Sequence, residues 1–247
     1  MLISIIIPAL NEESGIKKTI STISTAKIYE LGYELELIVI DGNSTDLTRD
    51  VAKQMGAKVI IEKRKGYGRA YKTGLAAAKG DIIVTLDADG TYPAELIPEY
   101  IQQLNKNGAM FITINRFAET EKGSINVMNK IGNRILTTTM QLLYSINIKD
   151  SQSGMWIIKR EFIDTINLKS DDMSMSEEIK IIAFKFFKSL ELDGKYYRRI
   201  GQEKLEPFKH GWRNFKYLFQ YKALVKFAIK PQYILSPKIS AHEKRST

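Results

Sequence analysis

Short apolar runs alternate with amphipathic stretches through the first half of the chain, and this alternation limits the fold more than any other feature. The runs are rich in Ile, Val and Leu, as expected for strands that are buried on both faces. Turn and cap residues separate them from stretches with helical spacing. Such repetition predicts an α/β fold, a parallel sheet with helices on both faces. The expected strands are 3–7, 35–40, 58–61, 82–86 and 110–115, and the expected helices are 12–29, 45–56, 68–79 and one that opens at Pro93.

The second half of the chain is less regular, and it contains no internal repeat and no low-complexity linker. We therefore predict one main domain over 1–210 and a basic amphipathic helix with a tail over 211–247. The expected elements of the second half are helices over 124–144 and 176–188 and strands over 156–158 and 192–200.

Polar clusters follow three of the expected strands, each at the carboxyl end of its strand. In an open parallel sheet, ligands bind in the crevice beyond these ends. Neighbouring strands lie about 4.8 Å apart, so loops from several strands can line one pocket. Each cluster is a weak signal alone, but together they predict a ligand site. The clusters are Pro8-Ala9-Leu10-Asn11-Glu12, Asp41-Gly42-Asn43-Ser44-Thr45-Asp46 and Asp87-Ala88-Asp89-Gly90.

Asp87 and Asp89 form the strongest single motif. Alternate residues that leave a strand can direct both carboxylates at one cation, which would bridge a diphosphate and offset charge on a leaving nucleotide. The chain has no cysteine and only two histidines, so a metal would need oxygen ligands, which favours Mg²⁺ or Mn²⁺. A solvated turn is the alternative, and the buried strand before the motif favours the metal site.

The other two clusters offer groups that suit a nucleoside. Asp41 follows a buried run, where a carboxylate can accept from ribose hydroxyl or base N–H groups, and we expect a similar role for Glu12. Ser44, Thr45 and Asp46 precede a helix, so we expect them to be turn and cap residues.

A basic loop with two glycines, residues 63–69, opens the third expected helix. Phosphate binding at that helix N-terminus would bring in Lys65. The loop lacks the GK[ST] ending of a Walker A motif, and basic loops are usually solvated, so exposure of Lys65 is the favoured alternative.

These motifs, in this order and spacing, resemble those of family 2 glycosyltransferases, which have the GT-A fold. Within that family the chain is similar to dolichyl-phosphate mannose synthase and its archaeal polyprenyl-phosphate glycosyltransferase relatives. The resemblance covers roughly residues 3–215. It rests on PALNEE at 8–13, IDGNSTDLT at 40–48, KGYGRA at 65–70, TLDADGTYP at 85–93, Arg116, Gly132-Asn133-Arg134, Asp150-Ser151-Gln152-Ser153-Gly154, Tyr197-Arg198-Arg199-Ile200-Gly201 and Lys204-Leu205.

The resemblance implies a Rossmann-like, mostly parallel sheet and a role for each matching position. Its donor-binding residues would be Pro8, Ala9, Asn11, Glu12, Asp41, Lys65, Asp87, Ala88, Asp89, Arg199 and Lys204. Among these, Pro8, Glu12 and Asp41 would hold the nucleobase and ribose, Asp87 and Asp89 the metal, and Arg199 with Lys204 the diphosphate. The residues implied to act in catalysis are Asp89, Arg116, Arg134, Glu178 and Arg199.

The chain departs from the family pattern at Leu10, Gly42 and Thr91, where many members have an aromatic residue, a second aspartate and a glutamine. These departures keep the predicted nucleotide site but do not determine which base and which sugar the donor carries. We therefore expect either GDP-mannose or a UDP-sugar as donor. Because of Lys130 and Asn133, the family's acceptor-site motif can be aligned with this sequence in two registers that differ by about one residue.

The resemblance also implies metal-dependent, inverting transfer to dolichyl or polyprenyl phosphate. A phosphate monoester is largely a dianion at neutral pH, so it needs arginines such as Arg116 and Arg134 to position it rather than a strong base. The alternative acceptor, a saccharide hydroxyl, would need a carboxylate base. Glu178 is the candidate for that base, whereas we expect Glu177 on an exposed helix face.

The formal net charge of +9 is concentrated near the C-terminus, because residues 195–247 hold 13 Lys and Arg but only three Asp and Glu. The expected C-terminal helix carries apolar residues on one face and lysines on another, as do helices that lie in a membrane interface. Packing on the domain is the alternative. The apolar residues are Trp212, Phe215, Phe219, Leu224, Val225 and Ile229, and the lysines are Lys222, Lys226 and Lys230.

A lipid-phosphate acceptor favours the membrane as the partner of this helix. No stretch reaches the roughly 20 apolar residues that a spanning helix needs, so we expect a peripheral protein on the cytoplasmic face of a membrane. A membrane partner subunit or a homo-oligomer stays open. A basic tail also suits a nucleic-acid-binding protein, but that function gives no reason for the acidic clusters, so we expect no nucleic-acid partner.

Overall fold

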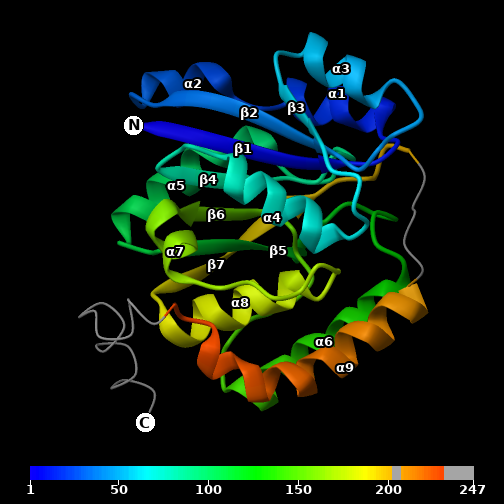
Figure 1. Ribbon diagram of the computed structural model, residues 1–247, viewed down its shortest axis with the longest axis vertical. Coiled ribbons are helices and arrows are strands. Elements are labelled where there is room, and N and C mark those ends of the chain that lie inside the picture. The colour runs from blue at the N-terminus through cyan, green and yellow to red at the C-terminus, as the bar shows by residue number, and fades with distance from the viewer. Residues whose placement is uncertain (202–206, 231–247) are drawn as a thin grey trace.

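A computed structural model describes residues 1–201 and 207–230 of the chain. Seven strands form one sheet in the order β3-β2-β1-β4-β6-β5-β7 (Figure 1). All neighbouring pairs are parallel except those of β6, which is antiparallel to β4 and to β5. The predicted α/β class with a mostly parallel sheet is therefore confirmed. The strands are β1 (Leu2–Ala9), β2 (Glu34–Asp41), β3 (Lys58–Ile61), β4 (Ile82–Thr85), β5 (Phe111–Thr120), β6 (Trp156–Lys159) and β7 (Ser189–Tyr196).

Each face of the sheet carries its own apolar core. Ile6 of β1 belongs to one core, whereas Ile5 and Ile7 belong to the other, because successive side chains of a strand point to opposite faces. Both faces are covered, which explains why the strands are continuous apolar runs rather than alternating ones.

Helices cover both faces of the sheet (Figure 1). The core that contains Ile5 is covered by α1 (Glu13–Ser21), α2 (Thr25–Glu30), α3 (Thr48–Gln54) and α5 (Ile97–Lys106). The core that contains Ile6 is covered by α4 (Tyr67–Ala77), α6 (Val127–Tyr144), α7 (Arg160–Thr165), α8 (Met175–Phe186) and α9 (Pro207–Leu224). Short 3₁₀ helices, η1 (Ala94–Leu96) and η2 (Val225–Phe227), precede α5 and follow α9.

The structure differs from the expected elements at several boundaries. The single helix expected over 12–29 is two helices, because the Thr22 hydroxyl donates to the Lys18 and Thr19 carbonyls and the Ser24 hydroxyl to Glu95 O, so the first helix ends. Strand β5 extends to Thr120, which places Arg116 within it, and α7 was not expected.

The C-terminal helix α9 lies beside α6 (Figure 1). Leu218 and Tyr221 are almost fully buried against the domain, whereas Trp212, Phe219 and Leu224 are exposed. One side of the helix therefore packs on the core while apolar side chains remain on the other. None of the helices within 1–201 and 207–230 is both long enough and apolar enough to cross a bilayer.

Candidate functional site

The first two polar clusters meet at one edge of the sheet and bond to each other. Ala9 pairs with Asp41 in the β1–β2 register. The Asn11 side-chain oxygen accepts from the Thr45 backbone N–H at 2.7 Å, and the Asn11 N–H donates to Ser44 Oγ at 2.9 Å. These contacts join the loops after β1 and β2 into one wall.

Asp41 is fully buried in this wall. Its Oδ2 accepts from the N–H groups of Asn43 and Ser44 at 3.1 and 3.0 Å. Its Oδ1 has no hydrogen-bond partner in the described residues. Leaving a buried acceptor unpaired is unfavourable, so a hydroxyl or N–H donor of a ligand would fit here.

Arg199, which follows β7, links the first and third clusters. Its Nη1 lies 2.6 Å from Asp89 Oδ2, and its Nη2 donates to Glu12. The other Asp89 oxygen accepts from Thr91 N and Oγ1 at 3.1 and 2.6 Å. Glu12 and Asp89 are both buried, so the arginine offsets two carboxylates that water cannot fully solvate.

Asp87 lies beside two tyrosines of α4, whose hydroxyls are 3.2 Å (Tyr71) and 3.4 Å (Tyr67) from its Oδ1. Burial and the neighbouring Asp89 raise the pKa of Asp87 to about 7, although Arg116 lowers it. Two carboxylates that repel each other form a suitable pair for a divalent cation. No third Asp, Glu or His joins them as a metal-binding group in the described residues.

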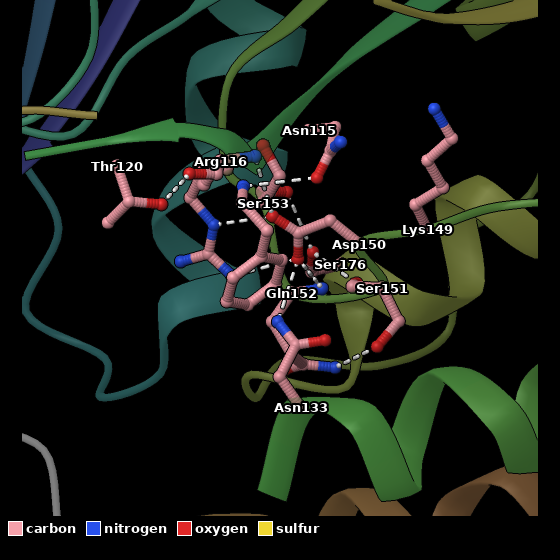
Figure 2. Close-up of polar contacts among 12 residues, drawn as sticks. Asn115, Arg116, Thr120, Asn133, Lys149, Asp150, Ser151, Gln152, Ser153 and Ser176 are labelled. Carbon is pink, nitrogen blue, oxygen red and sulfur yellow. Dashed lines mark hydrogen bonds and ion pairs between the residues drawn. The ribbon is translucent and has the colours of Figure 1, made fainter. Parts of the chain in front are cut away.

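Arg116 and Asp150 form a second polar centre (Figure 2). Arg116 Nε and Nη2 lie 2.7 and 2.9 Å from the two Asp150 oxygens, and Asn133 Nδ2 donates to Asp150 Oδ1 at 2.8 Å. Burial would raise the pKa of Asp150, but the Arg116 guanidinium lowers it to about 2.

The Arg116 guanidinium is held from several sides. It lies 5.4 Å from the Tyr196 ring centroid and 5.8 Å from that of Phe117. Its remaining nitrogen points away from Asp150 in Figure 2. Asp150 and the rings therefore fix the arginine while one N–H-bearing edge is directed elsewhere.

The other predicted site residues lie on the surface, in the walls around the site or outside the described residues. Arg134 and Lys65 are exposed, and Lys204 falls outside the described residues. Asn133, rather than Arg134, reaches Asp150, because one position along a helix turns a side chain by about 100°. Pro8 is half-buried, and Ala9 and Ala88 are buried in the walls around the site.

The carboxylate of Glu178, the predicted base for a hydroxyl acceptor, fixes the loop before α8. Its Oε1 and Oε2 accept from the N–H groups of Lys169 and Ser170 at 2.7 and 2.8 Å. The prediction that Glu177 is exposed is wrong, because this side chain has no exposed surface. Helix α8 packs against α4, α6, α9 and β7, so even its first turn is covered.

Sequence patterns missed Tyr67, Tyr71 and the buried polar residues of α8 as parts of this region. Tyr67 lies in the basic loop and Tyr71 in the helix expected after it, and only their distances to Asp87 reveal their place. Asp150 and Asn133 stood in matched motifs, but nothing local indicated that they bond to each other.

The model of glycosyl transferase family 2 matches residues 4–166. The low-salt glycan biosynthesis hexosyltransferase Agl6 of Haloferax volcanii is 32% identical over 221 residues, 87% of this chain and 52% of that protein. The chain thus spans about half the length of this relative. A dolichyl-phosphate hexose transferase of the same organism is 27% identical over 210 residues, covering 85% of this chain and 89% of that one. A dolichol-phosphate mannosyltransferase of Pyrococcus furiosus is 28% identical over 244 residues, covering 93% and 68%.

A solved structure has the same fold. Glucosyl-3-phosphoglycerate synthase of Mycobacterium tuberculosis, in complex with Mn²⁺, UDP-glucose and phosphoglyceric acid, superposes with a TM-score of 0.72 at 22% identity, covering 91% of this chain and 80% of that one. The family match, the relatives and this fold agree with the resemblance in the sequence motifs. The chain belongs to glycosyl transferase family 2.

Proposed function

We propose that the protein transfers a hexose from a nucleotide-diphosphate sugar, GDP-mannose or a UDP-sugar, to dolichyl or polyprenyl phosphate, with inversion. The observation that carries this proposal is the fixed position of Arg116. Asp150 holds its guanidinium, and the charge of the guanidinium lowers the pKa of Asp87. A phosphate dianion needs a positioned guanidinium and no strong base. Glu178, the candidate base for a hydroxyl acceptor, uses both oxygens to hold backbone N–H groups, which favours the phosphate.

The donor would lie along the three clusters. Asp41 Oδ1 and Glu12 would accept from the nucleoside, and Arg199 would contact the diphosphate. Asp87 and Asp89 would hold Mg²⁺ or Mn²⁺, which would offset negative charge on the leaving nucleotide. The names of the two dolichyl-phosphate relatives and the Mn²⁺ and UDP-glucose in the mycobacterial structure support this assignment.

The proposed lipid acceptor requires contact with a membrane, and α6 with α9 offers a surface for it. Five apolar side chains of α6 are exposed on the side of the helix opposite the buried Asn133, and α6 and α9 also carry exposed lysines and an arginine. This pattern favours a peripheral position on an anionic, cytoplasmic membrane face. We call this surface the α6–α9 face. It comprises Val127, Met128, Ile131, Ile135 and Leu142 with Trp212, Phe219 and Leu224, flanked by Lys130, Arg134, Lys216 and Lys222.

The test is transfer of radiolabel from a panel of UDP- and GDP-sugars into organic-extractable lipid, with polyprenyl phosphate and Mn²⁺ or Mg²⁺. We expect one donor to label lipid, with labelling lost in Asp89→Asn and kept in Asp50→Asn, whose side chain is exposed on α3. Label in a soluble saccharide and none in lipid would replace the acceptor with a hydroxyl compound. Label in neither product would contradict the proposed transfer.

A further inference from the structure

Lys180 of α8 is a lysine with no exposed surface. Its Nζ donates to the Ser151 carbonyl at 2.8 Å, to the Ser153 carbonyl at 2.5 Å and to Ser176 Oγ at 3.0 Å. These three contacts match the three donors of an ammonium group, although burial lowers the pKa of Lys180 to about 7. Nζ also lies 5.7 Å from the centroid of the Trp156 ring. Lysine is almost never fully buried without a partner, and here two backbone carbonyls and a hydroxyl take that place.

Both carbonyls belong to the segment 150–154, which we call the clamp loop. At one end, Asp150 holds the Arg116 guanidinium. At the other end, the Gly154 carbonyl accepts from Thr85 Oγ1 at 2.7 Å, and a Cβ added to Gly154 would lie 3.1 Å from Asp87 Oδ1. The clamp loop therefore runs from the arginine proposed for the acceptor to a carboxylate proposed for the metal.

Other contacts also fix the clamp loop, and one of them reaches the Ser153 carbonyl, which accepts from the Trp156 indole N–H at 2.8 Å. Gln152 Nε2 donates to Glu177 Oε1 at 2.8 Å, and Gln152 Oε1 accepts from Asn214 of α9 at 3.0 Å. The Ser176 hydroxyl reaches the Ser153 carbonyl at 3.2 Å and the Ser151 carbonyl at 3.4 Å, both longer than the lysine bonds. Lys180 therefore makes the shorter of the contacts that α8 offers to the middle of the loop backbone.

We propose that Lys180 is a positioning residue, which pins the clamp loop and thereby sets Arg116 relative to Asp87. This inference rests on the proposed function, since it assigns Arg116 to the acceptor and Asp87 to the donor metal. Without Lys180, the Ser151 carbonyl keeps only the long contact from Ser176, and the Ser153 carbonyl keeps the Trp156 indole N–H and Ser176, so the middle of the loop would move to find another donor. Misplacement of reacting groups by about 1 Å can lower a rate by about a hundredfold.

The experiment compares Lys180→Met with Lys188→Met, an exposed lysine just beyond the end of the same helix. Methionine keeps the length and apolar stem of the side chain but removes its three donors. Circular dichroism and thermal unfolding first establish that each variant is folded. Hydrogen exchange of the amides in 151–154 then reports the clamp, and the acceptor and donor KM values and kcat report the site.

For Lys180→Met we expect faster exchange of the clamp-loop amides and a loss in kcat/KM for the acceptor on the order of tenfold to a hundredfold. We expect the donor KM to change less than about twofold, because Gly154 at the Asp87 end keeps its bonds to Thr85 and Tyr92, and because Asp41 and Glu12 bond to other segments. Lys180→Arg, which keeps a charge and donors, should restore part of the acceptor kcat/KM. Lys188→Met should match the wild type in every measurement.

Unchanged exchange in folded Lys180→Met would overturn the clamp, whatever the enzyme transfers. Faster exchange with unchanged kinetics would show that the loop does not position the reacting groups. Equal losses in kcat/KM for the donor and for the acceptor would mean that Lys180 supports the structure in general and does not position the acceptor side of the site. An inactive wild type would instead reject the proposed function, while hydrogen exchange would still decide whether Lys180 holds the loop. If Lys180→Met does not fold, the same comparison is made with Lys180→Gln.

Discussion

Glu177 shows at the residue scale how burial changes the chemistry of one side chain. It has no exposed surface, its Oε1 accepts from Gln152, and its Oε2 has no partner in the described residues. Burial raises its pKa from 4.5 to about 8. Between these two pH values the folded protein holds a proton that the unfolded chain releases.

The consequence is a stability that falls as pH rises from about 4.5 to about 8, since the native state binds the extra proton. Glu177→Gln keeps the acceptor for Gln152 and removes the titration. We expect the variant to gain free energy of unfolding over the wild type, and this gain should be larger at pH 8 than at pH 5 by on the order of 1–3 kcal/mol. Urea unfolding at both pH values measures this difference.

Glu30→Gln is the matched control, because Glu30 is exposed at the end of α2. Its effect should be within about 0.5 kcal/mol at both pH values. An equal gain for Glu177→Gln at pH 5 and pH 8 would contradict a buried, protonated Glu177.

At the scale of elements, Gly154 marks where the clamp loop meets the loop after β4. A Cβ at this position would lie 2.5 Å from the Tyr67 hydroxyl and 3.1 Å from Asp87 Oδ1. The first separation is shorter than van der Waals contact permits, so the tyrosine or the loop would have to shift. The absence of a side chain at Gly154 lets the two loops approach.

We expect Gly154→Ala to weaken Mn²⁺ binding in the presence of nucleotide by about tenfold, because Asp87 would be displaced. Isothermal calorimetry with Mn²⁺ and UDP or GDP measures this change. Gly132→Ala on α6 is the control, since nothing lies within 4 Å of its added Cβ. That variant should keep its metal affinity and gain about 0.5–1 kcal/mol of stability from a more favourable helix residue. Equal metal affinities for the two variants would separate Gly154 from the metal site.

At the scale of the whole molecule, helices α6 and α9 close one side of the structure, opposite α1 and α3 (Figure 1). Trp212 of the α6–α9 face is 61% exposed, whereas the other tryptophan, Trp156, has no exposed surface. A blue shift of tryptophan emission on adding vesicles would therefore report Trp212 alone. The protein carries its own probe for the proposed membrane contact.

We expect this shift with vesicles that contain phosphatidylserine and a weaker one with phosphatidylcholine alone, because exposed lysines flank the apolar side chains. Ile135→Glu, at a side chain that is 53% exposed on α6, should weaken binding by about tenfold. Leu47→Glu, at a side chain that is 61% exposed on the loop before α3, should have no effect. Equal vesicle binding by the wild type, Ile135→Glu and Leu47→Glu would show that the α6–α9 face does not contact the membrane.

Much of the fold and part of the candidate site could be predicted from local patterns. Buried strands are short apolar runs, and polar turns follow them. The positions of the strands along the chain and of the three clusters can therefore be predicted from neighbouring residues. Asp87, Asp89 and Asp41 were found in this way. Their roles toward ligands stay predictions.

The sequence by itself determined the α/β class, the family motifs and the sheet edge at which the polar clusters gather, because each depends on residues close together in the chain. Only the tertiary structure decided that Asn133 reaches Asp150, that Glu178 holds a loop, and that Glu177 and Lys180 are buried. A prediction from helical periodicity assumes that one face of each helix is exposed to solvent. Helix α8 has no such face in its first turn, because elements far away in the sequence cover it. Burial of a charged side chain is therefore set by how distant segments pack, and that packing changes the chemistry of the side chain.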